Sequence, residues 1–219
     1  MLVLGVDTAT AAVTAVLGEI TDDGVRLLQA DVVVDGRAHG ERLAPAIDAV
    51  LRRAGRTPAD LSAVVGGTGP GPFTGLRVGL VTATALAQAL DIPAYGVCSL
   101  DAIGAATGPG RVLVATDARR REVYWALYVD GIRETDPAVD TPARVAELAK
   151  ADRAVGDGAL KYADVLALPV ADEPRYPVPA ALFDLAATRV RAHAPTETLT
   201  PLYLRRPDAV AATTRKPVL

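Results

Sequence analysis

The chain has 219 residues, of which 50% are apolar and 22% are charged, so it can bury a substantial core and is too apolar to be intrinsically disordered. Its formal net charge of −3 excludes an overall basic field of the kind that draws a protein to nucleic acid or to a membrane surface. Cys98 is the single cysteine, which excludes an internal disulfide and is typical of a reducing compartment.

The sequence predicts no membrane association. Its first ten residues have neither a basic start nor a long apolar segment, so they do not form a signal peptide. The longest apolar stretch, residues 78–98, is interrupted by polar residues and by Pro93, and is therefore not predicted to span a bilayer. We expect a cytoplasmic protein.

The first half of the chain predicts three strands followed by alternating helices and strands. The three strands cover residues 2–6, 12–20 and 25–34, and hairpin-type turn residues join the last two. The periodicity then predicts these elements in order: a helix over 40–54, a strand over 63–65, a helix over 75–90, a strand over 92–98 and a helix from residue 100. An antiparallel meander followed by parallel crossovers predicts an α/β protein of the RNase H-like and actin-like architecture.

The second half carries a weak internal repeat of the first. An apolar strand ends in Asp7 and another in Asp117, and in both cases a new strand begins six residues later. A Gly-Pro-rich stretch at residues 107–111 precedes the repeat, so we expect two related subdomains, 1–106 and 107–219, each a mixed sheet flanked by helices. The remaining expected elements of this half are helices over 142–150 and 179–194, a proline-rich loop between them and an irregular tail from Pro207.

The segment GTGPGPFTGLR, residues 67–77, joins a predicted strand to a predicted helix. A glycine-rich loop in this position often holds phosphate on the helix N-terminus. However, the loop lacks the Lys-Ser/Thr ending of the P-loop, and Pro70 and Pro72 remove two N–H donors. Two interpretations stay open, a turn that only aims the helix and a weak phosphate contact.

The aspartates of the two repeats are candidates for the chemistry of a nucleotide site. Two carboxylates at equivalent hairpins could hold a metal–phosphate complex, or each could accept N–H bonds within its own turn. The expected nucleotide contacts, if nucleotide binds, are Asp7, Thr8, Thr10, Gly69, Gly71 and Asp117.

Other catalytic machinery is sparse. The two serines and two histidines form no nucleophile or metal motif, so a serine, cysteine or zinc hydrolase has little support. The three arginines 119–121 are interpreted as a solvated turn, with phosphate or RNA contact as the alternative. The helix over 76–90 is apolar or small nearly all round, which predicts that a partner covers one of its sides.

These residues resemble the TsaB (YeaZ) family, the non-catalytic partner in bacterial threonylcarbamoyladenosine synthesis on tRNA. The resemblance covers most of the chain in the same order, through the following blocks: DTAT from Asp7, HGERLAPAID from His39, GTGPGPFTGLRVGL from Gly67, SLDA from Ser99, DARRREVYWALY from Asp117 and PLYLRR from Pro201. Gly40 departs from the family pattern, in which a serine is expected after the histidine.

The resemblance implies an actin-like fold and a catalytic paralogue, TsaD, bound through helices that map onto residues 41–54 and 76–90. It also implies self-association through the same surface, an ATPase, TsaE, and an adenylate-forming enzyme, TsaC. The side chains expected at the partner interface are Leu43, Ile47, Val50, Leu51, Leu76, Gly79, Leu80, Ala83 and Ala87.

Three functions follow as hypotheses. The first is a scaffold subunit without turnover, required for modification of adenosine 37 of ANN-decoding tRNAs, with no required cofactor, no metal and indirect contact with tRNA. The second is an independent ATPase or small-molecule kinase in which Asp7, Thr8 and Asp117 surround Mg–ATP. The third, a glycoprotease, would need a nucleophile or metal that the residues do not supply. Whether ATP or ADP binds weakly, or at the partner interface, stays open.

Overall fold

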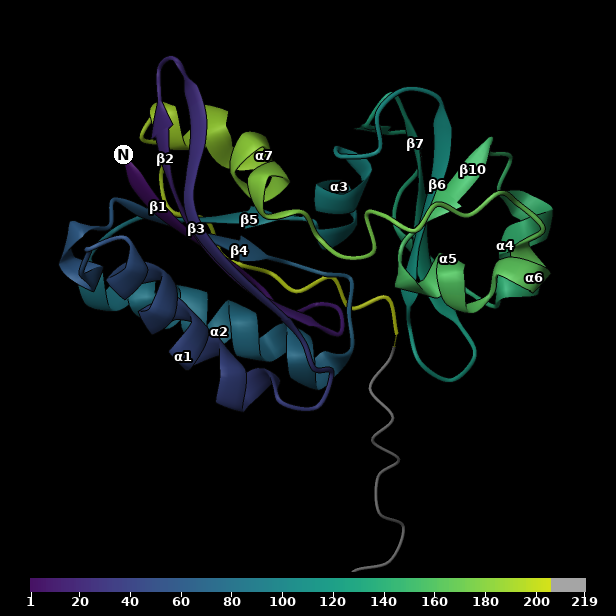
Figure 1. Ribbon diagram of the computed structural model, residues 1–219, viewed down its shortest axis with the longest axis horizontal. Coiled ribbons are helices and arrows are strands. Elements are labelled where there is room, and N and C mark those ends of the chain that lie inside the picture. Colours follow the sequence, from purple (N-terminus) through teal and green to yellow (C-terminus); the bar gives the residue numbers. More distant parts are fainter. Residues whose placement is uncertain (206–219) are drawn as a thin grey trace, which may run out of the picture.

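A computed structural model describes residues 1–205 and contains two β-sheets side by side, each flanked by helices (Figure 1). The first sheet has the strand order β3-β2-β1-β4-β5. Its strands are β1 (Leu2–Asp7), β2 (Ala12–Thr21), β3 (Gly24–Val34), β4 (Ala63–Gly67) and β5 (Ala94–Val97). The first three pair antiparallel, while β4 and β5 run parallel to β1, as the expected meander and crossovers require.

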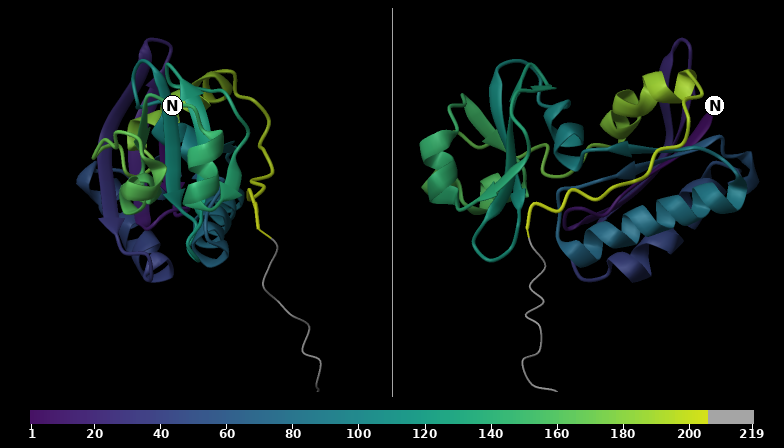
Figure 2. Two further views of the ribbon diagram at one scale, coloured as in Figure 1. Left: turned by 90° about the vertical axis from the view of Figure 1, so that its right-hand side faces the viewer. Right: turned by 180° about the vertical axis from the view of Figure 1, so that it is seen from behind.

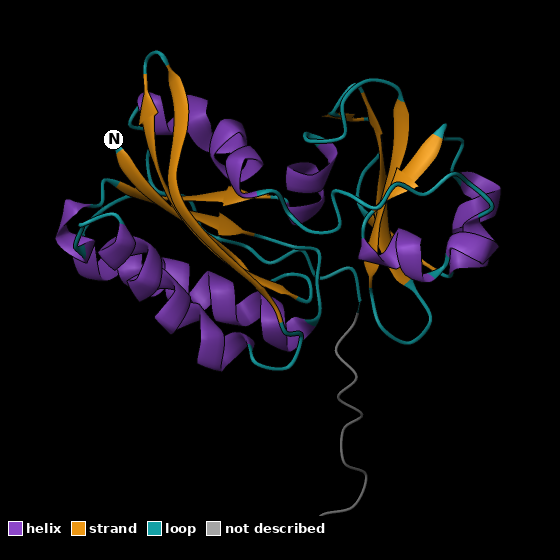
Figure 3. Cartoon of the chain, in the orientation of Figure 1, coloured by secondary structure: helices purple, strands orange, loops and turns teal. Residues whose placement is uncertain are grey.

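Helices cover both faces of the first sheet (Figure 3). α1 (His39–Arg53) and α2 (Phe73–Leu90) lie side by side on one face, and α7 (Pro179–Arg191) covers the other. Because both faces are buried, β1 has no polar residue from Leu2 to Val6 and does not alternate between apolar and polar residues. The short helix α3 (Ser99–Gly104) leads to the second half, and a single 3-10 turn, η1 (Pro58–Asp60), precedes β4.

The second sheet is smaller and has the order β10-β6-β7-β8, with β9 also paired to β7. Its elements are β6 (Arg111–Asp117), β7 (Val123–Val129), β8 (Ile132–Arg133), β9 (Ala138–Asp140), α4 (Pro142–Leu148), β10 (Arg153–Val155), α5 (Asp157–Lys161) and α6 (Ala163–Leu166). The sequence did not predict β8, β9, β10, α5 or α6. These elements have two to five residues, too few for hydrophobic periodicity to reveal.

The two halves share one arrangement. β1 pairs antiparallel with β2 and parallel with β4, and β6 pairs antiparallel with β7 and parallel with β10. Asp7 lies opposite Thr14, whereas Asp117 lies opposite Val123, so the turn of the second hairpin is one residue shorter. The duplicated α/β fold is confirmed.

The second half of the sequence also completes the first half of the structure. α7, which follows the second sheet in the chain, returns to pack on the first sheet through the fully buried Phe183 ring. A Cβ on Gly5 or Gly18 would lie 3.0 or 2.7 Å from that ring, so both strands need glycine there. Residues 107–205 are therefore not confined to one structural half.

After α7, residues 194–205, here called the strap, run along the edge of the first sheet toward the second half (Figure 2). The Glu197 amide donates to the Ala94 carbonyl at 2.9 Å, and the Glu197 carboxylate accepts from the Gly96 amide at 2.9 Å. The Leu202 amide then donates to the carbonyl of Thr68, in the glycine loop, at 2.9 Å. The strap thus covers β5, an edge strand that would otherwise present unpaired backbone groups. The tail expected from Pro207 lies outside the described residues.

Candidate functional site

The carboxyl group of Asp7 is the centre of a buried hydrogen-bond cluster at the end of β1. The side chain is 1% exposed, its Oδ1 accepts from the Ala9 amide at 2.8 Å, and its Oδ2 accepts from the Ser99 hydroxyl at 2.5 Å. A Cβ on Gly67 would lie 1.9 Å from Oδ2. Burial raises the pKa of Asp7, opposed by these two hydrogen bonds and by the field of His39. Asp7 is therefore engaged within the fold.

The glycine loop, within residues 67–77, packs around this hydrogen-bond cluster. The Ser99 amide donates to the Gly69 carbonyl at 2.7 Å, and the Gly69 amide donates back to the Ser99 hydroxyl at 3.1 Å. Gly69 has a φ of +88°, which favours glycine, and a Cβ on Gly71 would lie 2.2 Å from the Ala9 carbonyl oxygen. The space that these glycines leave is filled by the chain itself.

Thr8 joins β1 to α2. Its hydroxyl donates to the Gly75 carbonyl at 2.7 Å and accepts from the Gly79 amide at 2.8 Å. Gly75 and Gly79 are an i,i+4 pair, so the hydroxyl links the two groups that an α-helix would bond to each other. A Cβ on Gly79 would lie 2.5 Å from that hydroxyl. Thr8 thus positions the helix.

Thr10 and His39 form a second contact between β1 and the helices. The Thr10 hydroxyl accepts from the Ala12 amide at 3.2 Å. Because a carbonyl only accepts, His39 Nε2 carries the proton and donates to the Thr10 carbonyl at 2.8 Å. This contact ties the first residue of α1 to the turn after β1 and accounts for the histidine of the HGERLAPAID block.

Asp117, the second expected carboxylate, is held by residues of its own half. Its Oδ2 accepts from the Lys161 ammonium at 2.9 Å, and its Oδ1 accepts from the Arg119 amide at 3.1 Å. The Asp117 amide donates to Asp157, whose pKa is raised by burial. In the part of the chain that the structure describes, no group of three or more His, Cys, Asp or Glu residues could hold a metal.

The residues expected at the partner interface face the interior of the protein rather than its surface. All nine lie in the interior of the first half, including Leu80 and the small residues Gly79, Ala83 and Ala87 of α2. The small stripe serves close packing within the chain, because Gly79 meets Thr8 and Ala83 lies against Gly66 of β4. The residue-level prediction was wrong, since a helix that is apolar nearly all round does not reveal which stripe faces the sheet.

The exposed side of α2 is a different stripe. Phe73, Arg77, Val81 and Ala85 recur every four residues and are all exposed, with Val81 at 65%. α2 is the one described helix long and apolar enough to cross a membrane, but its inner face packs against β1 and β4 as a core helix does. The sequence signal for this exposed face was the regular spacing of four residues between its members, on the side of the helix opposite the buried residues.

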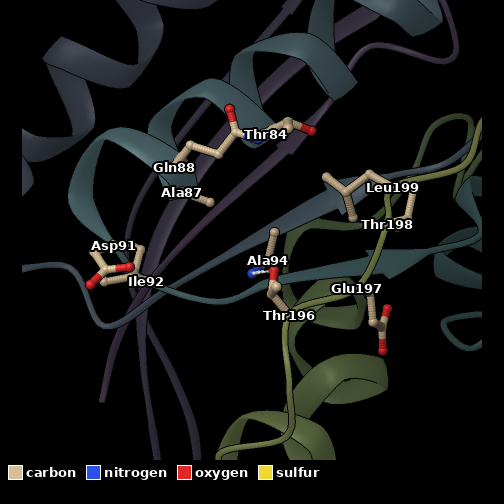
Figure 4. A pocket seen from close by; sticks show the side chains of 10 residues that line it. All are labelled: Thr84, Ala87, Gln88, Asp91, Ile92, Ala94, Thr196, Glu197, Thr198 and Leu199. Carbon is tan, nitrogen blue, oxygen red and sulfur yellow. Dashed lines mark hydrogen bonds between the residues drawn. The ribbon is translucent and has the colours of Figure 1, made fainter.

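A cavity of about 530 Å³ lies between the C-terminal end of α2, β5 and the strap (Figure 4). The Glu197 carboxylate in its wall accepts a hydrogen bond from the Gly96 amide. It also accepts from Arg189 Nη1, which lies 2.8 Å from Oε1 and 2.9 Å from Oε2. The Thr196 hydroxyl accepts from the Ala94 amide at 3.0 Å. These polar groups hold the strap on β5, so the cavity is a by-product of edge protection.

Comparison with known proteins identifies the family. Residues 33–183 match the model of the family TsaD, tRNA N6-adenosine threonylcarbamoyltransferase. An uncharacterized protein of Mycobacterium tuberculosis is 53% identical, and the match covers 94% of this chain and 93% of that protein.

Two further relatives are informative. The tRNA threonylcarbamoyladenosine biosynthesis protein TsaB of Escherichia coli is 37% identical over 132 residues, which cover 58% of this chain and 55% of that protein. A crystal structure from Pseudomonas aeruginosa, described as similar to peptidase YeaZ, is 31% identical with a TM-score of 0.76, and the match covers 93% of this chain and 99% of that one. The chain belongs to the TsaB (YeaZ) family, whose named members take part in threonylcarbamoyladenosine biosynthesis on tRNA.

Proposed function

We propose that this chain is a non-catalytic subunit that binds and supports a TsaD-type catalytic paralogue during threonylcarbamoyl transfer to adenosine 37 of ANN-decoding tRNAs, in the cytoplasm. The relatives named TsaB support the pathway. The scaffold role is supported by the candidate site, where Asp7, Thr8 and Ser99 all serve packing of the chain itself. An ATPase and an adenylate-forming enzyme supply the remaining chemistry.

The C-terminal part of the exposed stripe of α2, Val81 and Ala85, is the proposed partner surface. The observation that carries this proposal is Val81, 65% exposed at the middle of an 18-residue helix and followed by the exposed Ala85. Small and apolar side chains on a helix surface permit close approach by a second helix. α1 lies beside α2 and extends the surface with Ala44, Pro45 and Asp48.

The family match supports a TsaD-type protein as the proposed partner. The TsaD family model covers residues 33–183, which include α1 and α2, so a TsaD-type protein has counterparts of both helices. Two related helix pairs can pack about a pseudo-twofold axis, and two copies of this chain can pack about a true one. We therefore propose a heterodimer with the paralogue and a homodimer of the isolated chain through one surface.

The alternative, an independent ATPase or kinase, has weaker support. The Thr8 hydroxyl makes two hydrogen bonds to α2, Asp7 is buried against Gly67, and Asp117 binds Lys161. A nucleotide would have to displace these contacts. We propose that the chain requires no nucleotide of its own.

The test is reconstituted threonylcarbamoyl transfer to tRNA with the cognate TsaD-type paralogue, the ATPase, the adenylate-forming enzyme, threonine, bicarbonate and ATP. Val81→Arg should abolish both paralogue binding and product formation, because it places a charge in the helix contact. Ile132→Arg, at a residue 74% exposed in the second half, is the matched control and should behave as the wild type. Product formed without this chain, or paralogue binding unaffected by Val81→Arg, would contradict the proposal.

A further inference from the structure

Three exposed arginines lie near Phe73 without an ion pair. Elsewhere in the described residues, arginines commonly pair with a carboxylate, as Arg53 does with Asp31 and Arg189 with Glu197. In the same part of the chain, the guanidinium groups of Arg37, Arg77 and Arg119 make no ion pair, and all three residues are exposed. Among the described residues, Arg42, Arg121, Arg153 and Arg191 also make no ion pair, but Arg37, Arg77 and Arg119 are the ones that lie around Phe73. Three unpaired cations thus lie close together in a protein of net charge −3.

Two of these arginines line one pocket. Arg37 and Arg119 lie at a cavity of about 230 Å³ whose wall also includes Phe73, the first residue of α2. A Cβ on Gly36 would lie 2.9 Å from the Arg119 guanidinium, which brings Arg119 of the second half against the turn that carries Arg37. The neighbouring Asp35 carboxylate accepts from the Arg37 amide at 3.2 Å rather than from its guanidinium. The pocket therefore offers two cations to an anionic group.

An exposed aromatic pair adjoins the pocket. The rings of Phe73 and Tyr203 stack with centroids 5.2 Å apart, and the Arg77 guanidinium lies 4.3 Å from the Phe73 centroid. Phe73 is 46% and Tyr203 41% exposed, although rings of this size are usually more deeply buried. Stacked aromatic and guanidinium planes are the surfaces on which unpaired nucleobases stack.

The backbone holds the arginine turn in a costly conformation. Arg119, Arg120 and Arg121 have φ values of 62°, 52° and 63°, in the left-handed region that costs each such residue about 1–2 kcal/mol. Arg205 of the strap supports the turn, because its guanidinium donates to the Ala118 carbonyl at 2.8 Å and pairs with Glu122. The strap thereby fixes the arginine turn and Tyr203 together.

We propose that the pocket of Arg37 and Arg119, together with the Phe73–Tyr203 pair and Arg77, is a binding site for single-stranded RNA. A backbone phosphate enters the arginine pocket, and a neighbouring unpaired base stacks on the aromatic pair. The choice of a tRNA loop as the RNA rests on the proposed function. The surface lies at the N-terminal end of α2, whereas the proposed partner contact centres on Val81 and Ala85 further along the helix.

The test is fluorescence anisotropy of a fluorescein-labelled, unmodified anticodon stem–loop RNA, with the full chain alone and bound to the paralogue. Arg119→Glu should weaken binding about tenfold and reduce the slope of log affinity against log salt by about 0.7, since each phosphate contact on a single strand contributes about that much. Tyr203→Ala should weaken binding about tenfold by loss of stacking, while Tyr203→Phe should retain it. Arg144→Glu, an equal charge change at an exposed position of α4, is the matched control.

Several results would overturn this inference. Equal losses in Arg119→Glu and Arg144→Glu would show diffuse charge attraction rather than a site, and unaltered binding by Tyr203→Ala would refute base stacking. Full displacement of the RNA by millimolar inorganic phosphate would indicate a small-anion site instead. Loss of paralogue binding but not of RNA binding in Arg119→Glu would assign the patch to the protein partner. By contrast, Val81→Arg should lose paralogue binding and keep RNA binding, and loss of both would show that the two surfaces are not separate. A wild-type chain that binds no RNA yet supports modification would refute only the RNA site.

Discussion

Replacing Thr8 by valine tests the link between β1 and α2. The substitution keeps the side-chain shape but removes the hydroxyl that donates to the Gly75 carbonyl and accepts from the Gly79 amide, at a site 1% exposed. Each buried backbone group that loses its partner costs about 1–3 kcal/mol. Partial closure of the helix ladder between Gly75 and Gly79 reduces the total, so we expect a loss of about 3 kcal/mol.

In a chain of this length, ~3 kcal/mol lowers Tm by about 6–12 °C. The assay is thermal unfolding followed by circular dichroism, with urea unfolding to obtain the free energy. Thr8→Ser keeps the hydroxyl and is the control, expected to lose less than half as much. If Thr8→Val melts within about 1 °C of the wild type, the two backbone groups close on each other and the hydroxyl does not position the helix.

Three further predictions concern the core. Leu80→Asp, at a side chain 5% exposed, should destabilise by ~4 kcal/mol or prevent folding, and native-like melting would contradict its inward orientation. Burial raises the pKa of Asp7, so the folded state binds that proton more tightly than the unfolded chain, and stability should decline as pH rises from about 4 through the folded pKa. Urea unfolding across this range should show a shallower decline in Asp7→Asn, and an equal slope would exclude Asp7 as the source. Desolvation raises the pKa of the half-buried Cys98 thiol to about 12, so alkylation of the native thiol at about pH 8 should be roughly a thousandfold slower than that of a free cysteine, and rapid labelling would refute the raised pKa.

Much of the fold was predictable from local pattern. The hairpin at residues 21–24, the long helices and the aspartate at the end of each repeat all have signals within a few residues of sequence. The short elements of the second half lacked such signals. The return of α7 to the first sheet was also invisible, because no local signal states which of two sheets an apolar helix will cover.

The motifs themselves were visible, but their roles were not. The sequence determined that Asp7, Thr8 and the glycine loop are candidate contacts of one site, and its prolines already favoured a turn over a phosphate cradle. It identified Ser99 only as the start of the SLDA block. Only the tertiary structure decided that Ser99 bonds Asp7, that Thr8 enters the ladder of α2, and that Arg37, Arg119 and Tyr203 meet around Phe73. The physical reason is separation along the chain, since contacts between residues tens of positions apart depend on how whole elements pack. The tertiary structure also decided which side of α2 is exposed. In an almost uniformly apolar helix, the buried side is determined by the sheet against which the helix packs.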